Sequence, residues 1–475
     1  MLKILYVASE AVPFIKTGGL ADVAFSLPKA LKNMDVDIRV IVPKYKEIKD
    51  EFKDKMEHIT SFQVPLSWRR QYAGVDYLEY EGVPFYFIDN EDYFKRDGIY
   101  GHYDDGERFS YFCKAVIESM EKIGFIPDII HCNDWHTGII PLLLKDHYKK
   151  YGKYNHIKTI FTIHNLKYQG VFPKEMLEDV LGLGMEYYDE DGLEFYGGIN
   201  FMKGGIKYSD LVTTVSETYS NEIKDPFFGE RLDGLLRYRE DDLYGIVNGI
   251  DYEIYNPNND ENIFEKYDFN SIEKKEENKI RLQEQLNLPV RKDVPIISMV
   301  CRLANMKGLD LVLHVLEELL CEDVQLVILG TGQEEYEYKL KEFEYRYPKK
   351  LSANILFNEE LAHKMYAASD MFLMPSLFEP CGLGQLIALR YGTIPMVRET
   401  GGLNDTIKSF REDTKEGNGF SFTNYNAHDM LYTIRRALKF YENKEVWGKI
   451  VENAMNQEYS WNNSANKYKE LYYKI

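Results

Sequence analysis

A short glycine-containing motif occurs twice in this chain of 475 residues, once in each half. The first copy is Lys16-Thr17-Gly18-Gly19-Leu20, and the second is Glu399-Thr400-Gly401-Gly402-Leu403. Each copy follows an apolar, strand-like run, and the first precedes a helix-like run over 21–31. Adjacent glycines at such a junction let the backbone approach a ligand and direct free N–H groups at an anion. One junction in each half predicts two α/β domains facing each other across a cleft, although either copy alone is equally consistent with an ordinary glycine turn.

Strand-like and helix-like segments alternate along most of the chain, which predicts parallel strands joined by helices. The predicted strands cover 3–8, 37–42, 128–131, 158–163, 210–215, 245–248, 296–300, 324–329, 354–357, 371–375 and 394–397. Helices are expected at 107–122, 137–150 and 197–208, and hairpins at 62–89. The polar stretch 256–278 is interpreted as the linker region, and the tail 460–475 as a last amphipathic helix.

The length and composition are those of a globular protein with two domains of about 200–240 residues each. A net charge of −19 argues against a nucleic-acid partner, because phosphate backbones are bound by basic surfaces. No apolar run approaches the ~20 residues that span a bilayer, so no membrane segment is expected. The five cysteines are widely spaced and form no CxxC, which predicts a reducing, cytoplasmic location.

Polar and glycine-containing motifs follow the predicted strands, where open α/β sheets bind their ligands. Each alone could be a helix cap or a turn, but their joint placement indicates a binding site. They are Asn133-Asp134-Trp135-His136, His164-Asn165, Asn248-Gly249, Arg302 with Lys307-Gly308, Gly330-Thr331-Gly332, and the segment 376–384.

Three cations occupy predicted strand ends beside helix starts: Lys16, Arg302 and Lys307. An arginine and a lysine five residues apart can converge on one diphosphate, the lysine as a point charge and the arginine as a fork. Each cation alone would more commonly be a solvated surface group. Together with the glycine-rich loops, they predict an anion site suited to a nucleotide diphosphate.

One carboxylate, Glu379, falls within a predicted strand–turn–helix segment. Pro380 restricts Glu379 to extended geometry, and Gly382 and Gly384 bring backbone N–H groups to a helix start. Glu379 would then project near the ligand, where it could bind sugar hydroxyls or a developing positive charge. A glutamate that merely complements the helix dipole is an equal alternative from this segment alone.

No metal site is predicted, although two segments resemble ligand sets. His131, Cys132, Asp134 and His136 are close in sequence, but alternate strand residues face opposite sides of a sheet. Asp35-Val36-Asp37 matches an Asp-x-Asp motif but precedes its strand instead of following it. We therefore expect no required metal ion or other cofactor.

Six longer segments occur in order between residues 3 and 461. They are Lys16-Thr17-Gly18-Gly19-Leu20-Ala21-Asp22-Val23, His131-Cys132-Asn133-Asp134-Trp135-His136, Thr162-Ile163-His164-Asn165, Asn248-Gly249-Ile250-Asp251, Arg302 to Lys307-Gly308-Leu309-Asp310, and Phe378-Glu379-Pro380-Cys381-Gly382-Leu383. In sequence and spacing they resemble the family of bacterial glycogen synthases and plant starch synthases. The resemblance implies two Rossmann-like domains of the glycosyltransferase B type. It also implies retaining transfer of glucose from ADP-glucose to the non-reducing end of an α-1,4-glucan such as glycogen.

The resemblance further implies a role for each matching residue. Lys16, Arg302 and Lys307 would bind the donor diphosphate and stabilise the leaving group. Asp134 and His164 would contact the glucosyl unit, and Glu379 would lie beside the sugar. The remaining expected donor-binding residues are Gly18, Gly19, Asn248, Gly330, Phe357, Cys381, Gly382, Leu383, Thr400 and Gly401. Same-face displacement, in which the leaving phosphate helps to take the acceptor's proton, is the mechanism that the resemblance favours.

The resemblance also implies domain bounds of 1–248, with the tail 460–475 returning to this acceptor-side domain, and 249–459 for the donor-binding domain. It predicts a hinge near 248–251 and a second crossing near Trp461. The oligomeric state is left open.

Three residues depart from patterns common among relatives. Ile387 stands where related retaining transferases often carry a second glutamate, which narrows the branch. Leu377 replaces a common arginine, and Phe357 replaces a tyrosine expected near adenine. A transferase that uses UDP-glucose therefore remains an alternative. A non-catalytic glucan-binding protein is a second alternative, but it would be expected to lack some of the cations or Glu379, and all of these are present. A dinucleotide oxidoreductase is excluded because no GxGxxG follows a strand.

Overall fold

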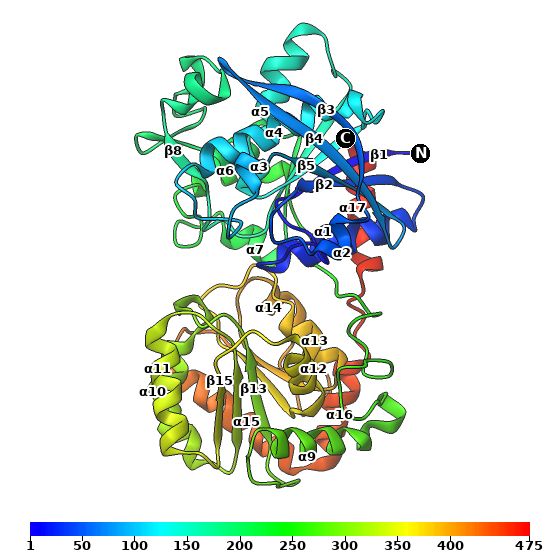
Figure 1. Cartoon of the computed structure of the whole chain (residues 1–475). Helices are drawn as coiled ribbons and strands as arrows, with labels where there is room; N and C mark the ends of the chain where they lie inside the picture. The colour runs from blue at the N-terminus through cyan, green and yellow to red at the C-terminus, as the bar shows by residue number, and fades with distance from the viewer. The chain divides into compact units, whose positions relative to one another are not determined.

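The computed structural model describes all 475 residues, and its contacts divide the chain into two compact units (Figure 1). The first unit comprises Met1–Asn248 and Trp461–Ile475, and the second comprises Gly249–Ser460. Each unit has its own sheet and its own hydrophobic core. None of the helices combines the length and the hydrophobicity that a membrane-spanning segment needs.

The first unit is built on a nine-stranded sheet in the order β12-β11-β7-β6-β1-β2-β5-β4-β3. From β12 to β5 all neighbours are parallel, and β4 pairs antiparallel with both β5 and β3. The strands are β1 (Lys3–Val7), β2 (Asp37–Pro43), β3 (Glu57–Leu66), β4 (Arg69–Tyr80), β5 (Val83–Asp89), β6 (Ile129–Asn133), β7 (Lys158–Ile163), β11 (Leu211–Thr214) and β12 (Leu243–Gly245).

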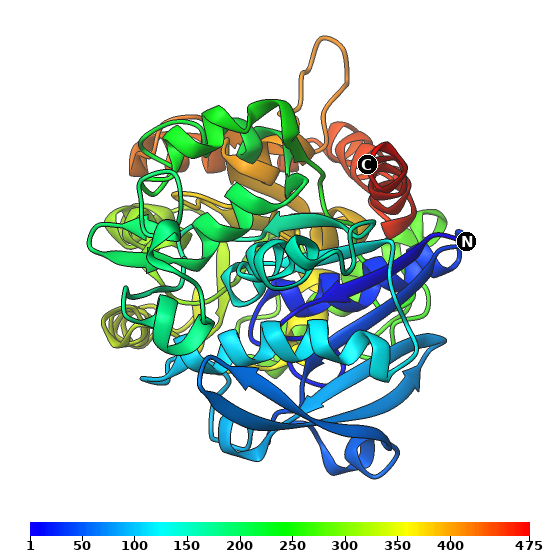
Figure 2. The ribbon, with the colours of Figure 1, turned by 90° about the horizontal axis from the view of Figure 1, so that it is seen from above.

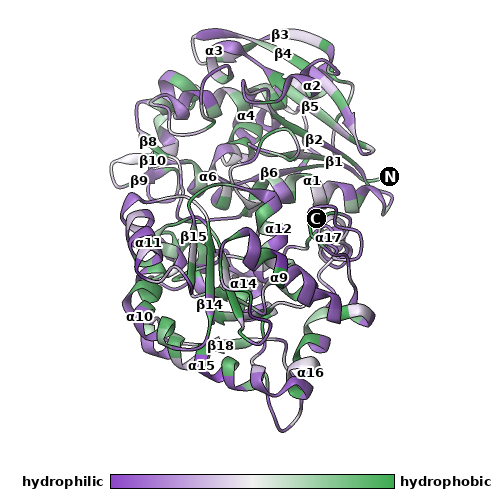
Figure 3. Ribbon diagram, turned by 60° about the horizontal axis from the view of Figure 1, so that its bottom comes forward, coloured by the Kyte–Doolittle hydropathy of each residue, from purple (hydrophilic) through white to green (hydrophobic).

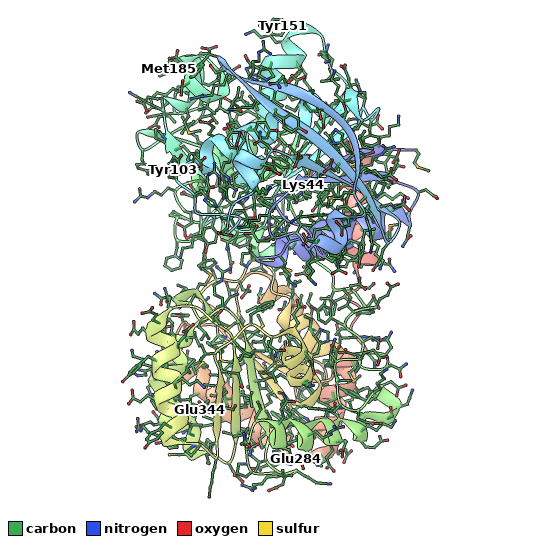
Figure 4. All side chains as sticks on the ribbon, in the orientation of Figure 1. Lys44, Tyr103, Tyr151, Met185, Glu284 and Glu344 are labelled. Atoms are coloured by element: carbon green, nitrogen blue, oxygen red, sulfur yellow. The ribbon has the colours of Figure 1, made fainter.

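The predicted hairpin region extends this main sheet instead of forming a separate one. Strand β5 pairs in parallel with β2, and the hairpin of β3 and β4 continues from its far edge. Lys44, which follows β2 and is labelled in Figure 4, pairs with Asp76 of β4 at 2.5 Å and with Asp89 at 3.5 Å. Helix α4 (Asp105–Lys122) lies across these strands (cyan in Figure 2).

Two predicted helices of the first unit differ from the structure. The stretch 137–150 is broken into a 3₁₀ turn, the short α5 (Ile140–Leu143), a π turn and a second 3₁₀ turn, with Pro141 near the start of α5. Helix α6 (Phe201–Tyr208) begins later than predicted, because residues 198–200 pair as β10 (Gly198–Asn200) in a small sheet with β8 (Val171–Pro173) and β9 (Glu194–Phe195). The other helices are α1 (Gly19–Lys32), α2 (Asp50–Lys53), α3 (Glu91–Phe94), α7 (Glu217–Glu222) and α8 (Asp233–Tyr238).

The last helix of the chain, α17 (Trp461–Lys474), is part of the first unit and packs against α1. Its Ser464 donates a hydrogen bond of 2.6 Å to the carbonyl of Val247. Its Tyr472 lies 2.7 Å from Nδ1 of the buried His131 in β6. The amphipathic pattern of the tail therefore reflects a face that completes the core of the first unit.

The second unit is a six-stranded parallel sheet in the order β15-β14-β13-β16-β17-β18, the doubly wound arrangement of a Rossmann-like fold. The strands are β13 (Ile296–Val300), β14 (Gln325–Leu329), β15 (Leu351–Asn354), β16 (Met371–Met374), β17 (Ile394–Arg398) and β18 (Phe420–Phe422). The helices are α9 (Lys275–Gln285), α10 (Leu309–Cys321), α11 (Glu334–Arg346), α12 (Glu359–Ala368), α13 (Gly384–Arg390), α14 (Gly401–Thr406), α15 (Ala427–Glu442) and α16 (Lys444–Met455). The strands are mostly hydrophobic and the outer helix α11 is mostly hydrophilic (Figure 3), because helices bury both faces of a parallel sheet.

Two predicted strands are displaced. A strand was predicted at 354–357, but the observed strand β15 ends at Asn354. It ends there because Asn358 caps the next helix, its side chain accepting from the N–H of Leu361 at 2.8 Å. Phe357 therefore lies in a loop and is 79% exposed. The strand predicted at 245–248 is β12, which ends at Gly245, and Asn248 follows it.

The interpretation of 256–278 as a linker is wrong. These residues lie inside the second unit, and the chain passes between the units at residues 248–249 and 460–461. Their polar groups serve buried contacts: the Tyr267 hydroxyl donates to the carbonyl of Tyr391 at 2.7 Å, and the Asn278 side chain accepts from two backbone N–H groups. The polar composition of 256–278 therefore reflects hydrogen bonds within the second unit and not an exposed linker.

Candidate active site

The carboxylate of Glu379 forms the centre of a polar cluster in the second unit. Glu379 lies in the loop after β16, and Lys307 lies in the 3₁₀ turn 305–307 after the neighbouring strand β13. Lys307 Nζ is 2.6 Å from Oε2 of Glu379, and the Ser376 hydroxyl donates to the same oxygen at 3.0 Å. Glu379 is buried, whereas the side chain of Lys307 is partly exposed. This pair is a cation and an anion held together at the carboxyl edge of a parallel sheet.

The electrostatics of the pair keep Lys307 charged. Burial opposes the charge of Lys307, but the nearby carboxylate of Glu379 outweighs it and raises the pKa of Lys307 above its ordinary value. Lys307 is therefore an ammonium ion at neutral pH. Its partly exposed face leaves it able to bind an anion while it remains paired with Glu379.

The second glycine pair is required by the loop that carries Glu379. Gly401 has φ +43°, and a Cβ there would collide with the carbonyl oxygen of Glu379. A Cβ at Gly402 would collide with the backbone of Cys381, and the N–H of Gly402 donates to the carbonyl of Glu379 at 3.2 Å. Close approach of two protein loops therefore accounts for these glycines. The prediction that these glycines also let the backbone approach a ligand is not tested by these contacts.

The other predicted donor-binding residues of the second unit also follow its strands. Gly330 comes directly after β14, where a Cβ would collide with the carbonyl oxygen of Cys301. Gly382 has φ +74° just before α13, and the side chain of Gln385 donates to the carbonyls of Cys381 and Gly382. The remaining members are the exposed Arg302 after β13, Leu383 before α13, Phe357 after β15 and the buried Thr400 after β17.

Asp134 and His164 lie close together in the first unit, at the ends of the adjacent strands β6 and β7. Oδ1 of Asp134 accepts from the backbone N–H of His164 at 2.8 Å, and the His164 ring Nε2 is 2.9 Å from Oδ1 of Asn133. Burial raises the pKa of Asp134 to about 7 and lowers the pKa of His164 to about 3.

The hydrogen bond between His164 and Asn133 decides which ring nitrogen of His164 carries the proton. The Asn133 amide donates from Nδ2 to the carbonyl of Val7, which leaves Oδ1 as an acceptor. His164 therefore carries its proton on Nε2, and its unprotonated Nδ1 is an acceptor for a ligand hydroxyl.

The first glycine motif is held by the carboxylate of Glu10, which was not among the predicted site residues. Oε2 of Glu10 accepts from the backbone N–H of Thr17 at 2.5 Å and from its hydroxyl at 2.8 Å. Burial raises the pKa of Glu10 to about 7. Gly18 caps the N-terminus of α1, which begins at Gly19, and Lys16 pairs with Asp22 of that helix at 2.9 Å. A carboxylate shortly after the buried strand β1, which ends at Val7, was the available signal for Glu10.

Asn248 is the last residue of the first unit before the chain enters the second. It is buried, and its side-chain Oδ1 has no hydrogen-bond partner within the protein. Such an oxygen is suited to a donor group of a ligand.

A pocket of about 650 Å³ in the first unit was also not predicted. Its wall includes the aromatic side chains of Trp135, Tyr168, Phe172 and Phe195, together with polar groups such as Arg231. Trp135 directly follows Asp134, so the pocket adjoins the segment after β6 that carries Asp134.

The residues considered as metal ligands do not converge. His131 contacts Tyr472 and Thr162, whereas His136 contacts Ser9. No group of three or more His, Cys, Asp or Glu side chains is placed to hold a metal ion.

Comparisons with known proteins decide the family. A family profile described as starch synthase catalytic domain matches residues 3–238, and one described as glycosyl transferases group 1 matches residues 281–454. A glycogen synthase from Clostridium acetobutylicum is 60% identical, and the alignment covers 100% of both chains. The chain belongs to the glycogen synthase and starch synthase family. It is therefore a glycosyltransferase, as the resemblance predicted.

Two further family members agree with this assignment, and a more distant protein shares the fold. A glycogen synthase from Anoxybacillus flavithermus is 56% identical over 99% of this chain and 97% of its own. The catalytic domain of starch synthase IV from Arabidopsis thaliana, solved bound to ADP and acarbose, has a TM-score of 0.93 and 34% identity, covering 100% of this chain and 99% of that one. A sucrose-phosphate synthase from Thermosynechococcus elongatus, at 17% identity and a TM-score of 0.64, covers 100% of this chain and 99% of its own, and shares the fold alone. The predicted glycosyltransferase B-type α/β fold is confirmed.

Proposed function

We propose that this glycosyltransferase moves glucose from ADP-glucose to the non-reducing end of an α-1,4-glucan such as glycogen, with retention of configuration and release of ADP. The observation that carries the proposal is the cluster of Lys307, Glu379 and Ser376 at the carboxyl edge of the second sheet. The glycogen synthases at 56–60% identity and the starch synthase solved with ADP support this choice of substrates.

The proposed donor site is in the second unit. Arg302 and Lys307 would bind the diphosphate, and the charge of Lys307 would stabilise the leaving group as it departs. Glu379 would face the anomeric centre, where positive charge develops. Gly382 and Leu383 would cover the phosphate or sugar from the start of α13, and Gly330, Cys381, Thr400 and Gly401 would surround the nucleotide sugar. The exposed ring of Phe357 would stack on adenine.

The proposed sugar contacts of the first unit follow from its polar and aromatic groups. Asp134 would accept hydrogen bonds from sugar hydroxyls, and Nδ1 of the neutral His164 would accept another. The aromatic wall of the pocket beside Trp135 would stack on glucose rings of the acceptor, because ring faces of sugars are apolar. Lys16, Gly18 and Gly19 would bind an anionic group at the start of α1, and Asn248 would supply a further acceptor oxygen.

In the proposed mechanism the acceptor hydroxyl attacks the face from which the diphosphate leaves. The bond from the anomeric carbon to the phosphate oxygen breaks as the new glycosidic bond forms on that same face. The hydroxyl proton passes to the departing phosphate oxygen, so that no protein base is needed. The proposal includes no cofactor, since ADP-glucose is a substrate and the protein supplies the cations.

A cytoplasmic location is part of the proposal. All five cysteines are free thiols, as expected for a protein in a reducing compartment.

The decisive experiment incubates the purified protein with glycogen and either ADP-glucose or UDP-glucose. We expect ADP release that depends on glycogen, with radioactive glucose incorporated into chains that β-amylase degrades. A Glu379→Gln variant is the matched negative control. Faster transfer from UDP-glucose would change the donor assignment to the alternative considered above. Absence of any glycogen-dependent nucleotide release would contradict the proposed activity and favour a non-catalytic glucan-binding protein.

A further inference from the structure

The guanidinium group of Arg398 donates hydrogen bonds to the backbone of the loop that carries Glu379. Arg398, the last residue of β17, donates from Nη1 to the carbonyl of Leu377 at 2.6 Å and to that of Ser376 at 3.4 Å. These residues immediately precede Phe378 and Glu379, and Ser376 also donates its hydroxyl to the Glu379 carboxylate. The position of Arg398 therefore limits where the Glu379 carboxylate can lie.

The aromatic ring beside Arg398 connects it to the loop that carries Lys307. The guanidinium carbon of Arg398 lies 5.7 Å from the centre of the Tyr425 ring. The Tyr425 hydroxyl donates to Oδ1 of Asp310 at 2.6 Å, and Asp310 is in the first turn of α10, three residues after Lys307. Burial and the Asp310 carboxylate both raise the pKa of Tyr425, so this hydroxyl is a donor at all ordinary pH values.

A direct backbone contact closes the ring of interactions. The N–H of Leu377 donates to the carbonyl of Met306 at 2.9 Å, which joins the Glu379 loop to the residue that precedes Lys307. Lys307 and Glu379 are thus linked by their own ion pair, by this backbone bond, and by the path through Arg398, Tyr425 and Asp310. Together these links restrict a lysine whose four-carbon stem is otherwise flexible.

We propose that Arg398 and Tyr425 are positioning residues for the Lys307–Glu379 pair, holding both charges in the geometry that glucosyl transfer requires. This inference rests on the proposed function, in which Lys307 and Glu379 contact the donor. Reacting groups must be held closely, and a displacement of about 1 Å can cost on the order of 10²-fold in rate. Neither positioning residue needs to contact the substrate itself.

The test compares Arg398→Met and Tyr425→Phe with matched surface variants of the same unit. Arg411→Met and Tyr432→Phe are the controls, because Arg411 forms only an exposed pair with Asp413 and Tyr432 is 72% exposed. We expect Arg398→Met to lower kcat at least tenfold while the KM for ADP-glucose changes less than threefold and the thermal midpoint stays close to that of the control. Tyr425→Phe should lower kcat by a smaller factor, and Arg398→Lys should recover part of the loss because an ammonium can still donate to the carbonyls.

A double-mutant cycle shows whether Arg398 acts through the pair. In a Glu379→Gln background, Arg398→Met should cost less than twofold further in kcat, because the geometry that it protects has already lost its charge. An equal loss in both backgrounds, or a rise in KM with unchanged kcat, would overturn the inference. If Arg398→Met fails to fold, the Tyr425→Phe and Arg398→Lys variants decide the question by the same criteria.

A readout that does not require glucosyl transfer separates this inference from the proposed function. Lysines methylated with ¹³C-formaldehyde give NMR signals that titrate, and a Lys307→Arg variant assigns the signal of Lys307. We expect the titration midpoint of Lys307 to fall in Arg398→Met, because its distance from Glu379 increases, and to stay unchanged in Arg411→Met. An unchanged midpoint in Arg398→Met would contradict the positioning role. Wild-type protein that releases no ADP with glycogen would instead contradict only the proposed function.

Discussion

Lys307 Nζ lies 2.6 Å from Glu379 Oε2, and the two residues come from loops that follow the paired strands β13 and β16. The parallel pairing of these strands brings their carboxyl ends to one edge, so residues separated by 72 positions meet. A lysine in this setting is charged and oriented before any ligand arrives. Preorganised charge of this kind stabilises developing negative charge without a reorganisation cost.

Replacement of this lysine tests its role in the transition state. We expect Lys307→Ala to lower kcat by 10²–10³, or about 3–4 kcal/mol, because the charge on the leaving diphosphate grows as the bond breaks. The control is Lys339→Ala, which removes an exposed lysine paired with Glu335. Steady-state kinetics with ADP-glucose distinguish the outcomes, since an increase in KM alone would mean that Lys307 binds substrate and transition state equally.

The carboxylate partner should have a different signature. Glu379→Gln keeps the size of the side chain and removes its charge, so transfer should collapse while ADP still binds in isothermal titration calorimetry. Glu284→Gln, at an exposed position of α9, is the matched control. Full activity in Glu379→Gln would reduce this residue to a hydroxyl ligand or a helix cap.

The glycine at position 402 should be intolerant of any side chain. A methyl group there would collide with the backbone of Cys381, so Gly402→Ala should displace the Glu379 loop and lower the thermal midpoint by at least about 2–4 °C, the shift that ~1 kcal/mol produces in a domain of this size. Gly448→Ala is the opposite control, because a methyl group at that position of α16 meets no neighbouring atom and alanine favours a helix by about 0.5–1 kcal/mol. Equal midpoints for the two variants would show that the loop moves without cost.

Glu10 predicts a pH dependence of stability in the first unit. Its pKa is raised from 4.5 to about 7, so the folded state binds the proton more tightly than the unfolded state. The stabilisation is fully present below pH 4.5 and is lost as the pH rises through about 7. In Glu10→Gln, which still accepts from Thr17, the urea midpoint should lose this decline between pH 4.5 and 7, measured against the exposed Glu57→Gln. An unchanged decline would assign it to other groups, Asp134 first among them.

The regular parts of the fold could be predicted because they depend on local patterns. Strands β7 and β13 begin and end at the predicted residues, since continuous apolar runs bounded by polar residues define them. The polar stretch 256–278 could not be placed, because whether Asn278 is solvated or buried depends on a distant backbone segment. Apolar content predicted that strand β15 extends to Phe357. The strand ends at Asn354 instead, because Asn358 caps the helix that follows.

In the candidate site, too, local sequence patterns predicted some features, whereas others depend on distant parts of the chain. Motifs after strands correctly placed Lys307, Glu379, Asp134 and His164 at the carboxyl ends of parallel strands, because that edge of a sheet gathers such residues, and their roles stay a prediction. Glu10 and the aromatic pocket beside Trp135 were missed, since both depend on how loops fold over the sheet. The reason for the second glycine pair was visible only in three dimensions, where the glycines face a carbonyl of the chain itself.

The return of α17 to the first unit makes that unit discontinuous, and this has a consequence for how the protein is made. Residues 249–460 are synthesised before the helix whose Tyr472 contacts His131 of β6 and whose Ser464 contacts Val247. Every residue of the second unit therefore precedes α17 in synthesis, whereas the first unit lacks the helix that packs against α1 and His131 until residues 461–475 have been added. A stop codon before Trp461 would accordingly damage the amino-terminal half of the enzyme and leave the carboxyl-terminal half intact.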